Sequence, residues 1–432
     1  MKKNIYTWVC LIAVLCVSLT MALTGCGESK PGPATGTGEI IIPEIPENLK
    51  GTEISIAHYY DPKNGDNGAT DIIDIFMQKT GINVKIDIYP QSEYYTKLAS
   101  LVAGGEAPDI FFDNNNFPMT VSLADPLERT KLDLSDAFWD QSVIKHSTIN
   151  GKAYGLDAAG GLVGGGDLLY YNKTMFREYG IKTPDEYINE GKWTWEVFRE
   201  VCEEVRSANK KFEACGNIFL NVLAPYNTDL IKFSGGVFSS NLTDPALLAI
   251  TRVHGELLKD EYEEGTTDAF KGGTVGMQIV DHFGLKKSGY FQGMTDTVGY
   301  VDLPALTVDG KEIKPNGGYY QAYCIGKGSK NPEAAGLFLK TYLNPKNWDL
   351  DSVFVSEEAK EYHIKMKARP SDKISYMVSP GVLSLVDEFG IYAAAYGIQY
   401  NLDPAQITTA FEECSPYVDS AVKRANELFS GK

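Results

Sequence analysis

The sequence predicts an α/β fold with a largely parallel sheet, on the strength of three observations. Short strand-like runs lie at 53–59, 83–89 and 108–112, and stretches with the helical spacing of apolar residues separate them. Strands that alternate with helices form βαβ units, whose strands run parallel. Apolar residues make up 43% of the chain and charged residues 22%, which is ordinary globular composition. The length of 432 residues suits two or three domains.

The elements of the amino-terminal half follow from local signals. One helix is predicted over 70–80 and ends at Gly81, and a second over 94–102 ends at Gly104, because glycine favours the carboxyl end of a helix. Pro90 ends the strand that lies between them. In parallel sheets, ligands bind beyond the carboxyl ends of the strands. The polar residues that follow the first and third strands are therefore candidates for a binding site.

The later chain continues the pattern less regularly. A helix is predicted after Thr194, which is suited to cap it, and its apolar face includes Cys202 as a buried thiol. The other predicted elements are strands at 275–280 and 322–325, a helix over 331–343, and a carboxyl-terminal helix from Asp403 that Pro416 interrupts. The glycine cluster 160–166 is either a flexible crossing between two lobes or a plain surface loop.

The first 25 residues have the pattern of an export signal. Two lysines precede an apolar run over 8–17, and small residues follow it up to Cys26. A membrane-spanning helix is the alternative, which Ser18 and Thr20 weaken because they shorten the apolar run. The segment 23–26 resembles the lipobox of bacterial lipoproteins, which implies cleavage just before Cys26 and a diacylglycerol on its sulfur, with fatty chains such as palmitate. Residues 26–50 are expected to form a flexible tether.

Charge and motifs exclude several classes of function. The net charge is −17, which disfavours nucleic acid as a partner and leaves the lipid anchor as the expected contact with the membrane. The sequence has no Walker loop, HExxH or GxSxG motif, and no metal-ligand spacing of cysteines. We therefore expect no catalytic residue, no metal and no cofactor. Spacing does not decide whether Cys202, Cys215, Cys324 and Cys414 form disulfides.

Several segments, in their order and spacing, resemble one family. They are Phe76–Val84, Tyr94–Ile110, Lys152–Leu156, Leu169–Phe176, Trp193–Phe198, Gly276–Met277 and Ser329–Ala335. Together they resemble the family 1 extracellular solute-binding proteins of bacterial ABC importers, in their lipid-anchored, sugar-binding form. One position departs from the pattern. Asp157 stands where this family commonly has proline, and its charge would either meet the ligand or fix the hinge.

The resemblance implies a two-lobed, periplasmic-binding-protein-like α/β fold (type II). Its ligand cleft lies between two lobes that are joined by crossing segments. Lobe one would comprise 51–157 plus 320–350, and lobe two 165–316 plus 355–432.

A sugar presents hydroxyl edges and an apolar C–H face, so its site needs polar side chains beside flat aromatic rings. On lobe one, strand ends supply Tyr59, Tyr60, Asp61, Asp113 and Asn114. The alternative for either tyrosine is that its ring packs in the core and does not line the cleft. Asp113 and Asn114 are plain turn residues if they do not bind hydroxyls, because both types favour turns.

On lobe two, the resemblance assigns a stacking ring to the position just after the strand 275–280. Phe283 is the best candidate, with His282 in its place as the alternative. Isolated histidines near strand ends, such as His58 and His282, are more often packed than catalytic. The remaining candidates on this lobe are Tyr226, Asn227, Tyr319 and Arg369, the last being either a ligand to hydroxyls or a surface charge.

These features imply a monomeric protein, lipid-anchored on the extracytoplasmic face of the cell membrane. It would capture a carbohydrate, with an oligosaccharide as the first expectation, and deliver it to the permease subunits of an ABC transporter. Two other classes stay open: a secreted, lipid-anchored glycoside-active enzyme, and a ligand-sensing subunit of a membrane receptor. A solute other than a sugar also stays open.

Overall fold

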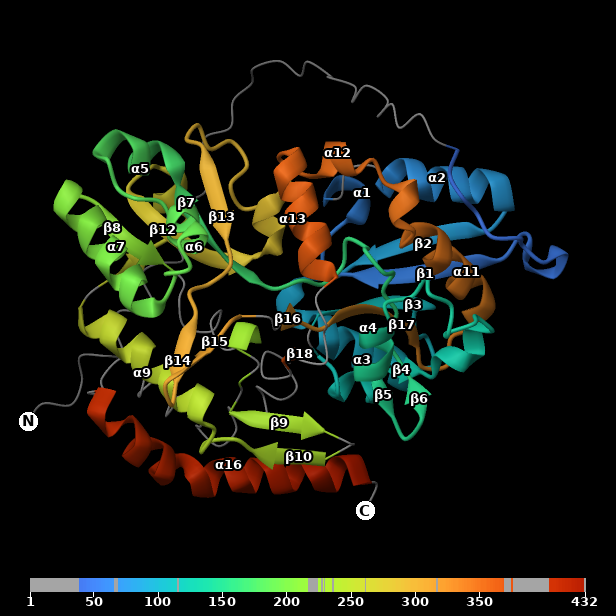
Figure 1. Cartoon of the computed structure of the whole chain (residues 1–432). Coiled ribbons are helices and arrows are strands. Elements are labelled where there is room, and N and C mark those ends of the chain that lie inside the picture. Colours follow the sequence, from blue (N-terminus) through green and yellow to red (C-terminus); the bar gives the residue numbers. More distant parts are fainter. Residues whose placement is uncertain are drawn as a thin grey trace, which may run out of the picture. The chain divides into compact units, whose positions relative to one another are not determined.

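The computed structural model describes residues 39–65, 69–114, 116–216, 224–226, 228, 230–234, 237–260, 262–315, 318–368, 374–375 and 404–430. Two five-stranded sheets organise this part of the chain (Figure 1). The expected signal peptide and the candidate lipidation residue Cys26 lie outside the described residues.

The first sheet gathers strands from both ends of the chain. In spatial order they are β2 (Asn83–Ile88), β1 (Glu53–His58), β3 (Ile110–Asn114), β17 (Gln321–Gly326) and β4 (Ala124–Asp125). β1 pairs in parallel with β2 and β3, as the alternating pattern predicts. β17 runs antiparallel to β3 and β4, so the sheet is mixed. A strand that enters from some 200 residues downstream is not bound by the βαβ rule.

Helices beside this sheet bury the apolar faces that the sequence shows. They are α1 (Pro62–Gly65), α2 (Ala69–Thr80), α3 (Tyr94–Ala103), α4 (Gln141–His146) and α11 (Pro332–Tyr342). α2 and α11 pack against each other through Phe76 and Phe338, whose ring centroids lie 5.2 Å apart. Tyr94 of α3 donates its hydroxyl hydrogen bond to carbonyls of two strands, Ala57 and Phe112, and so fastens the helix to the sheet.

The second sheet is also mixed. Its order is β11 (Glu263–Gly265), β8 (Glu213–Gly216), β12 (Val275–Asp281), β7 (Asp167–Asn172) and β13 (Val298–Val301). β8 pairs in parallel with β11 and β12, whereas β7 is antiparallel to β12 and β13. The helices of this region are α5 (Lys173–Tyr179), α6 (Pro184–Asn189), α7 (Trp195–Ala208), α9 (Pro245–Lys259) and α10 (Thr267–Lys271). As predicted, Thr194 caps α7 by accepting a hydrogen bond from the Val197 amide, and Cys202 is buried on its inner face.

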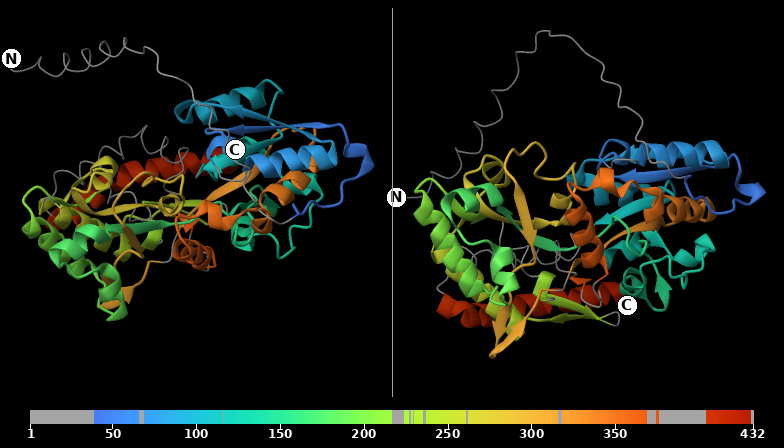
Figure 2. Two further views of the ribbon diagram at one scale, coloured as in Figure 1. Left: turned by 90° about the horizontal axis from the view of Figure 1, so that it is seen from above. Right: turned by 45° about the horizontal axis from the view of Figure 1, so that its top comes forward.

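The remaining elements are short pairs of strands and three further helices. The pairs are β5 (Thr148–Ile149) with β6 (Lys152–Ala153), β9 (Ile231–Ser234) with β10 (Val237–Ser240), β14 (Leu306–Val308) with β15 (Lys311–Ile313), and β16 (Gly318–Tyr319) with β18 (Ile374–Ser375). The helices are α12 (Leu350–Val353), α13 (Glu357–Lys367) and α16 (Ile407–Ser430). α16 lies along β10 in both views of Figure 2.

The carboxyl-terminal helix differs from its prediction. α16 continues through Pro416, where an interruption was expected. The side chain of Asn426 hydrogen-bonds the backbone amide and carbonyl of Phe238 in β10, at 2.7 and 2.9 Å. Phe411 and Val418 are buried on either side of the proline. Packing of the helix face thus outweighs the one backbone hydrogen bond that proline cannot donate.

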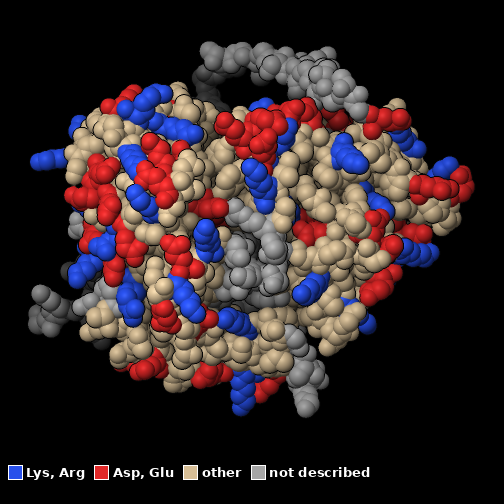
Figure 3. Space-filling view, viewed as in Figure 1, with Lys and Arg blue, Asp and Glu red and all other residues tan. Residues whose placement is uncertain are grey.

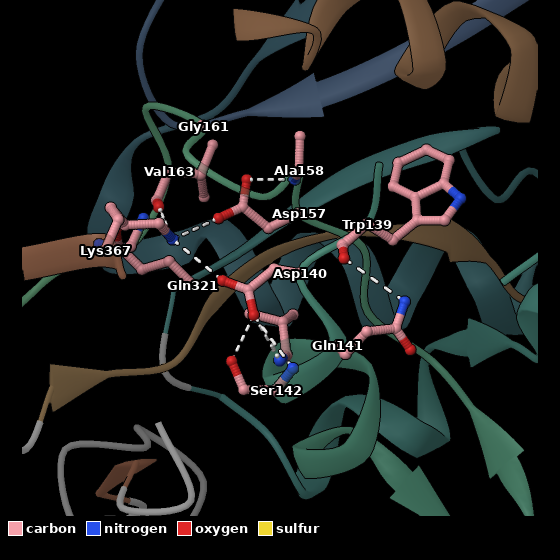
Figure 4. A network of polar contacts seen from close by, with 12 residues as sticks. Trp139, Asp140, Gln141, Ser142, Asp157, Ala158, Gly161, Val163, Gln321 and Lys367 are labelled. Carbon is pink, nitrogen blue, oxygen red and sulfur yellow. Dashed lines mark hydrogen bonds and ion pairs between the residues drawn. The ribbon is translucent and has the colours of Figure 1, made fainter. Parts of the chain in front are cut away.

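A buried ion pair joins the end of α13 to the segment that leads into β7 (Figure 4). The Lys367 ammonium lies 2.7 Å from a carboxylate oxygen of Asp157 and 3.5 Å from one of Asp140. It also donates to the carbonyl of Val163 at 2.7 Å. Burial raises the pKa of Asp157 to about 6, against the opposing effect of Lys367. Burial alone would lower the pKa of Lys367, but the two carboxylates hold it above its ordinary value. Asp157 therefore fixes the crossing, one of the two roles its sequence position allowed.

The cysteine side chains of the described residues are buried. These are Cys202, Cys215 and Cys324, and no disulfide joins Cys202 or Cys324 to another cysteine in the described ranges. Burial raises the pKa of both of these thiols well above its ordinary value. The helices in these ranges are also too short or too polar for any of them to span a bilayer.

We predict that Lys367→Met lowers the free energy of unfolding by about 3–5 kcal/mol, because it leaves buried carboxylates without a cation. The double variant Lys367→Met/Asp157→Asn should lose less, since the amide carries no charge. Urea unfolding measures both, and Lys192→Met, which breaks an exposed ion pair with Glu190, is the control. A loss from Lys367→Met no larger than that of the control would contradict the prediction.

Candidate functional site

The carboxyl ends of parallel strands mark where a site can form in each sheet. In the first sheet these are the ends of β1, β2 and β3, and in the second the ends of β8, β11 and β12. Backbone groups and side chains that leave such an edge are free of the sheet ladder and can face a ligand.

At the end of β1, His58 organises the turn. Its ring is fully buried and stacks on Phe112 with centroids 4.7 Å apart. Its Nδ1 accepts hydrogen bonds from the amides of Tyr59 and Tyr60, at 3.0 and 3.2 Å. Burial lowers the pKa of His58 to about 3, so the ring is neutral at physiological pH. The histidine is thus packed and shapes the following residues, as the sequence suggested.

The residues after His58 are half-buried. The Tyr60 ring meets the His58 ring edge-on at 4.0 Å, and the Tyr59 ring meets that of Tyr94 edge-on at 5.6 Å. Asp61 accepts a hydrogen bond from the amide of Lys63 at 3.0 Å. Tyr59, Tyr60 and Asp61 therefore leave part of their side chains accessible at the edge of the sheet.

At the end of β3, Asp113 is turned inward. It is fully buried, and its carboxylate accepts from the Thr120 hydroxyl at 2.6 Å, the Asn116 amide at 2.9 Å and the Tyr95 hydroxyl at 3.1 Å. Burial raises its pKa to about 6. With its oxygens engaged by three donors, Asp113 orders the loop after β3.

Asn114 connects this edge to the glycine cluster. Its side-chain oxygen accepts from Gln321 of β17 at 2.8 Å, and the Gln321 side-chain oxygen accepts from the Gly164 amide at 3.0 Å. Asn114 is half-buried, so it lies at the edge and also takes part in a structural link.

At the end of β12, two aromatic rings stand beside a carboxylate. Asp281 accepts from the Phe283 amide at 2.9 Å and from the Tyr290 hydroxyl at 3.1 Å. The two rings meet edge-on with centroids 5.3 Å apart. Phe283 is half-buried and Tyr290 is 37% exposed, so both present ring surface. Tyr290 carries no signal of its own in the sequence, because it reaches Asp281 only through the turn between them.

His282 points the other way. It is buried and packs against Gly165, where a Cβ would lie 2.3 Å from the imidazole Nδ1. Its ring centroid is 5.5 Å from that of His363 in α13. Burial lowers the pKa of His282 well below its ordinary value. Of the two residues considered for a stacking position, Phe283 is the one with accessible ring surface.

The ends of β1 and β12 influence each other. Burial, and then the electrostatic effects of Asp281, Asp167 and Tyr59, raises the pKa of the Tyr290 hydroxyl well above its ordinary value. Tyr59 follows β1 of the first sheet, and Tyr290 follows β12 of the second. Each edge holds its own pair of neighbouring rings: the ring centroids of Tyr59 and Tyr60 lie 5.6 Å apart, and those of Phe283 and Tyr290 lie 5.3 Å apart.

Four other residues were predicted for the site: Tyr226, Asn227, Tyr319 and Arg369. Tyr226 is buried; its hydroxyl accepts from the Trp195 indole at 2.9 Å and donates to the Pro304 carbonyl. Asn227 and Arg369 lie outside the described residues. Tyr319 is described only through its backbone, which pairs with Ser375. Within the described ranges, no cluster of histidine, cysteine and acidic side chains could hold a metal ion.

Five known proteins are similar in sequence at a significant level, among them two that are named for binding sugars. The diacetylchitobiose-binding protein DasA of Streptomyces coelicolor is 26% identical over 303 residues, which cover 66% of this chain and 68% of that protein. The multiple sugar-binding protein of Streptococcus mutans is 24% identical over 202 residues, or 44% of this chain and 43% of that one.

Many solved structures are similar in fold, among them two sugar-binding receptors. The galacto-N-biose-/lacto-N-biose I-binding protein of Bifidobacterium longum, in complex with lacto-N-biose, has a TM-score of 0.66 at 17% identity and covers 87% of this chain and 98% of that one. The GacH receptor of Streptomyces glaucescens has a TM-score of 0.62 at 16% identity and covers 85% and 98%. These likenesses confirm the predicted two-lobed α/β fold of periplasmic binding proteins.

The family match agrees with the family that the sequence motifs resemble. Residues 62–347 match the family described as bacterial extracellular solute-binding protein. This span includes every strand of both sheets except β1, and the candidate residues that follow β3 and β12, whereas those that follow β1, Tyr59 to Asp61, precede it. The chain belongs to the bacterial extracellular solute-binding proteins.

Proposed function

We propose that the protein captures a carbohydrate outside the cytoplasm and delivers it to the permease of an ABC importer. The observation that carries the proposal is the pairing of accessible aromatic rings with carboxylates at both strand edges: Tyr60 with Asp61, and Phe283 with Asp281. Rings suit the C–H faces of a sugar, and carboxylates suit its hydroxyls. Relatives that are named for binding diacetylchitobiose and lacto-N-biose support this ligand class.

The proposed ligand-contacting residues are Tyr59, Tyr60, Asp61, Asn114, Phe283 and Tyr290. In this proposal Asp113 and His282 support the site from behind, because both are buried and packed. Tyr226 has no part in it, since its hydroxyl is engaged inside the second lobe. Capture and delivery break no bond in the ligand, so the proposal assigns no catalytic residue.

The proposal retains two lobes, 51–157 plus 320–350 and 165–316 plus 355–432. The strands of the first sheet fall within the first pair of ranges and those of the second sheet within 165–316, which supports this division. Ligand would bring the ends of β1 and β12 closer, with the glycine cluster 160–166 as the segment between the sheets. We further propose that the protein acts as a monomer, held to the outer face of the membrane through Cys26.

A thermal-shift screen over mono- and oligosaccharides tests the ligand class. A sugar present at 100 times its Kd stabilises the native state by about 2.7 kcal/mol, which raises the melting temperature. We expect at least one carbohydrate to do so without being cleaved. Turnover of the sugar would favour the enzyme alternative, and stabilisation only by other solutes would overturn the carbohydrate proposal.

We predict that Phe283→Ala weakens binding of that carbohydrate by about 5- to 150-fold with little change in melting temperature, because the lost ring faces the ligand rather than the core. Calorimetry and thermal melting on the same variant measure both effects. Phe291→Ala is the matched control: Phe291 is a buried phenylalanine of the same region, packed on Tyr170 and Phe270, so its loss should mainly lower the melting temperature. A large melting drop with unchanged affinity for Phe283→Ala would place Phe283 in the core instead.

For the membrane anchor, we predict that Cys26→Ser releases the protein into the medium or leaves it as an unprocessed precursor. Acylation needs the cysteine sulfur, and firm anchoring needs more than one acyl chain. Cell fractionation with immunoblotting distinguishes the forms, and Cys202→Ser, which changes a buried thiol, should leave the anchored fraction unchanged. A processed Cys26→Ser protein that stays in the membrane fraction would rule out the lipobox.

A further inference from the structure

Two carboxylates face each other at the end of the second sheet nearest the proposed site. Asp167 opens β7 and Asp281 closes β12, and the antiparallel register pairs them directly. Side chains of directly opposed residues project to the same face, with Cβ atoms about 5 Å apart. Asp167 is only 5% exposed. The sequence does not predict this pair, because the two aspartates lie on strands more than a hundred residues apart.

The two carboxylates differ in their partners. Asp281 accepts hydrogen bonds from the Phe283 amide and the Tyr290 hydroxyl. Both carboxylate oxygens of Asp167 are buried without any hydrogen-bond partner in the structure as described. Buried carboxylates are almost always paired or hydrogen-bonded, since desolvation of an isolated charge is costly. Asp167 is thus the group at this edge that lacks donors.

Among the residues that the structure describes, no cation forms an ion pair with Asp167. Burial, followed by the repulsion from Asp281, raises the pKa of Asp167 well above its ordinary value. Lys286, whose charge opposes the raised pKa of Asp281, has its Nζ 5.7 Å from the centre of the Phe283 ring and forms an ion pair with neither aspartate within the described ranges. Like charges placed directly opposite on a sheet destabilise it. The pair therefore favours an incoming group that brings both hydrogen-bond donors and positive charge.

We infer that Asp167 and Asp281 form a subsite for a positively charged amino group, so that the carbohydrate taken by the protein is an amino sugar with a free amine. This inference rests on the proposed function. An ammonium supplies three donors, enough for both oxygens of Asp167 with one left for the Asp281 side. Its charge would relieve the repulsion between the two aspartates, which a neutral diol would not do.

The surroundings suit such a ligand. The Phe283 amide and the Tyr290 hydroxyl both donate to Asp281, so the two rings stand next to this carboxylate. Aromatic faces attract cations as well as the C–H face of a sugar. The net charge of −17 does not by itself favour a cationic ligand, because basic and acidic residues are interspersed over the face shown in Figure 3. The preference for a cation comes from the local pair of aspartates.

Three sugars that differ only at carbon 2 test the subsite: glucosamine, N-acetylglucosamine and glucose, each as monosaccharide and as β-1,4-linked disaccharide. Isothermal titration should show the free amine binding at least about 30-fold more tightly than its two counterparts. Asp167→Asn should remove that preference. The same variant, without ligand, should melt at an equal or higher temperature, because it removes an unpartnered buried charge. Glu196→Gln, an exposed position on α7, makes the same charge change and should alter neither result.

The outcomes separate this inference from the function it rests on. Equal or tighter binding of a neutral or N-acetylated sugar, from these probes or from the wider screen, overturns the amine subsite and leaves carbohydrate capture intact. So does an Asp167→Asn variant that keeps the preference for the amine. If no carbohydrate of any kind binds, the proposed function fails and the inference fails with it.

Discussion

One buried ammonium ties the end of α13 to a segment that lies far from it in the sequence. Lys367 reaches Asp157, Asp140 and the Val163 carbonyl, and each of these belongs to the chain that leads from the first sheet to β7. One helical turn earlier, His363 hydrogen-bonds the Gly161 carbonyl at 3.0 Å. Residues four apart share a helix face, so α13 contacts the crossing along one side. The position of the crossing depends on this contact, and so does the position of β7, into which the crossing leads.

The glycine cluster 160–166 lies in this crossing and makes close backbone contacts there. At Gly165 the backbone approaches the His282 ring so closely that no Cβ would fit. At Gly164 the amide is bound by Gln321, which also holds Asn114. The segment is therefore tied to the end of β3 on one side and to the end of β12 on the other. Such contacts set the distance between the two strand edges. Because glycine has no side chain, few groups in the segment resist a change in that distance. This combination suits a crossing between lobes better than a plain surface loop.

The sequence predicted which strands end at the site, but not how the side chains there are used. β1, β2 and β3 are recognisable from local pattern alone, and so are the residues that follow them. The inward turn of Asp113 is not, because it depends on Thr120 and Tyr95, which the sequence does not show to be neighbours.

Contacts between distant segments could not be predicted from the sequence either. The burial of Tyr226 depends on Trp195 and on the Pro304 carbonyl. The pairing of Asp167 with Asp281 depends on the antiparallel register of β7 and β12, whereas the alternating pattern favours parallel strands. A local pattern identifies a strand and its end; the partner across the sheet is a property of the whole fold.

The groups at the two edges divide into satisfied and unsatisfied ones, and this division has a physical consequence. Asp113 accepts hydrogen bonds from three donors and the Nδ1 of His58 accepts from two amides, so both hold the backbone of the first edge in one arrangement before any ligand arrives. Asp167 has no such partners, and its burial costs stability that the rest of the fold must offset. A fold tolerates local violations of this kind mainly where function requires them. A ligand that satisfies Asp167 would recover that cost only in the bound state, and the recovered free energy would appear as affinity rather than as stability of the empty protein.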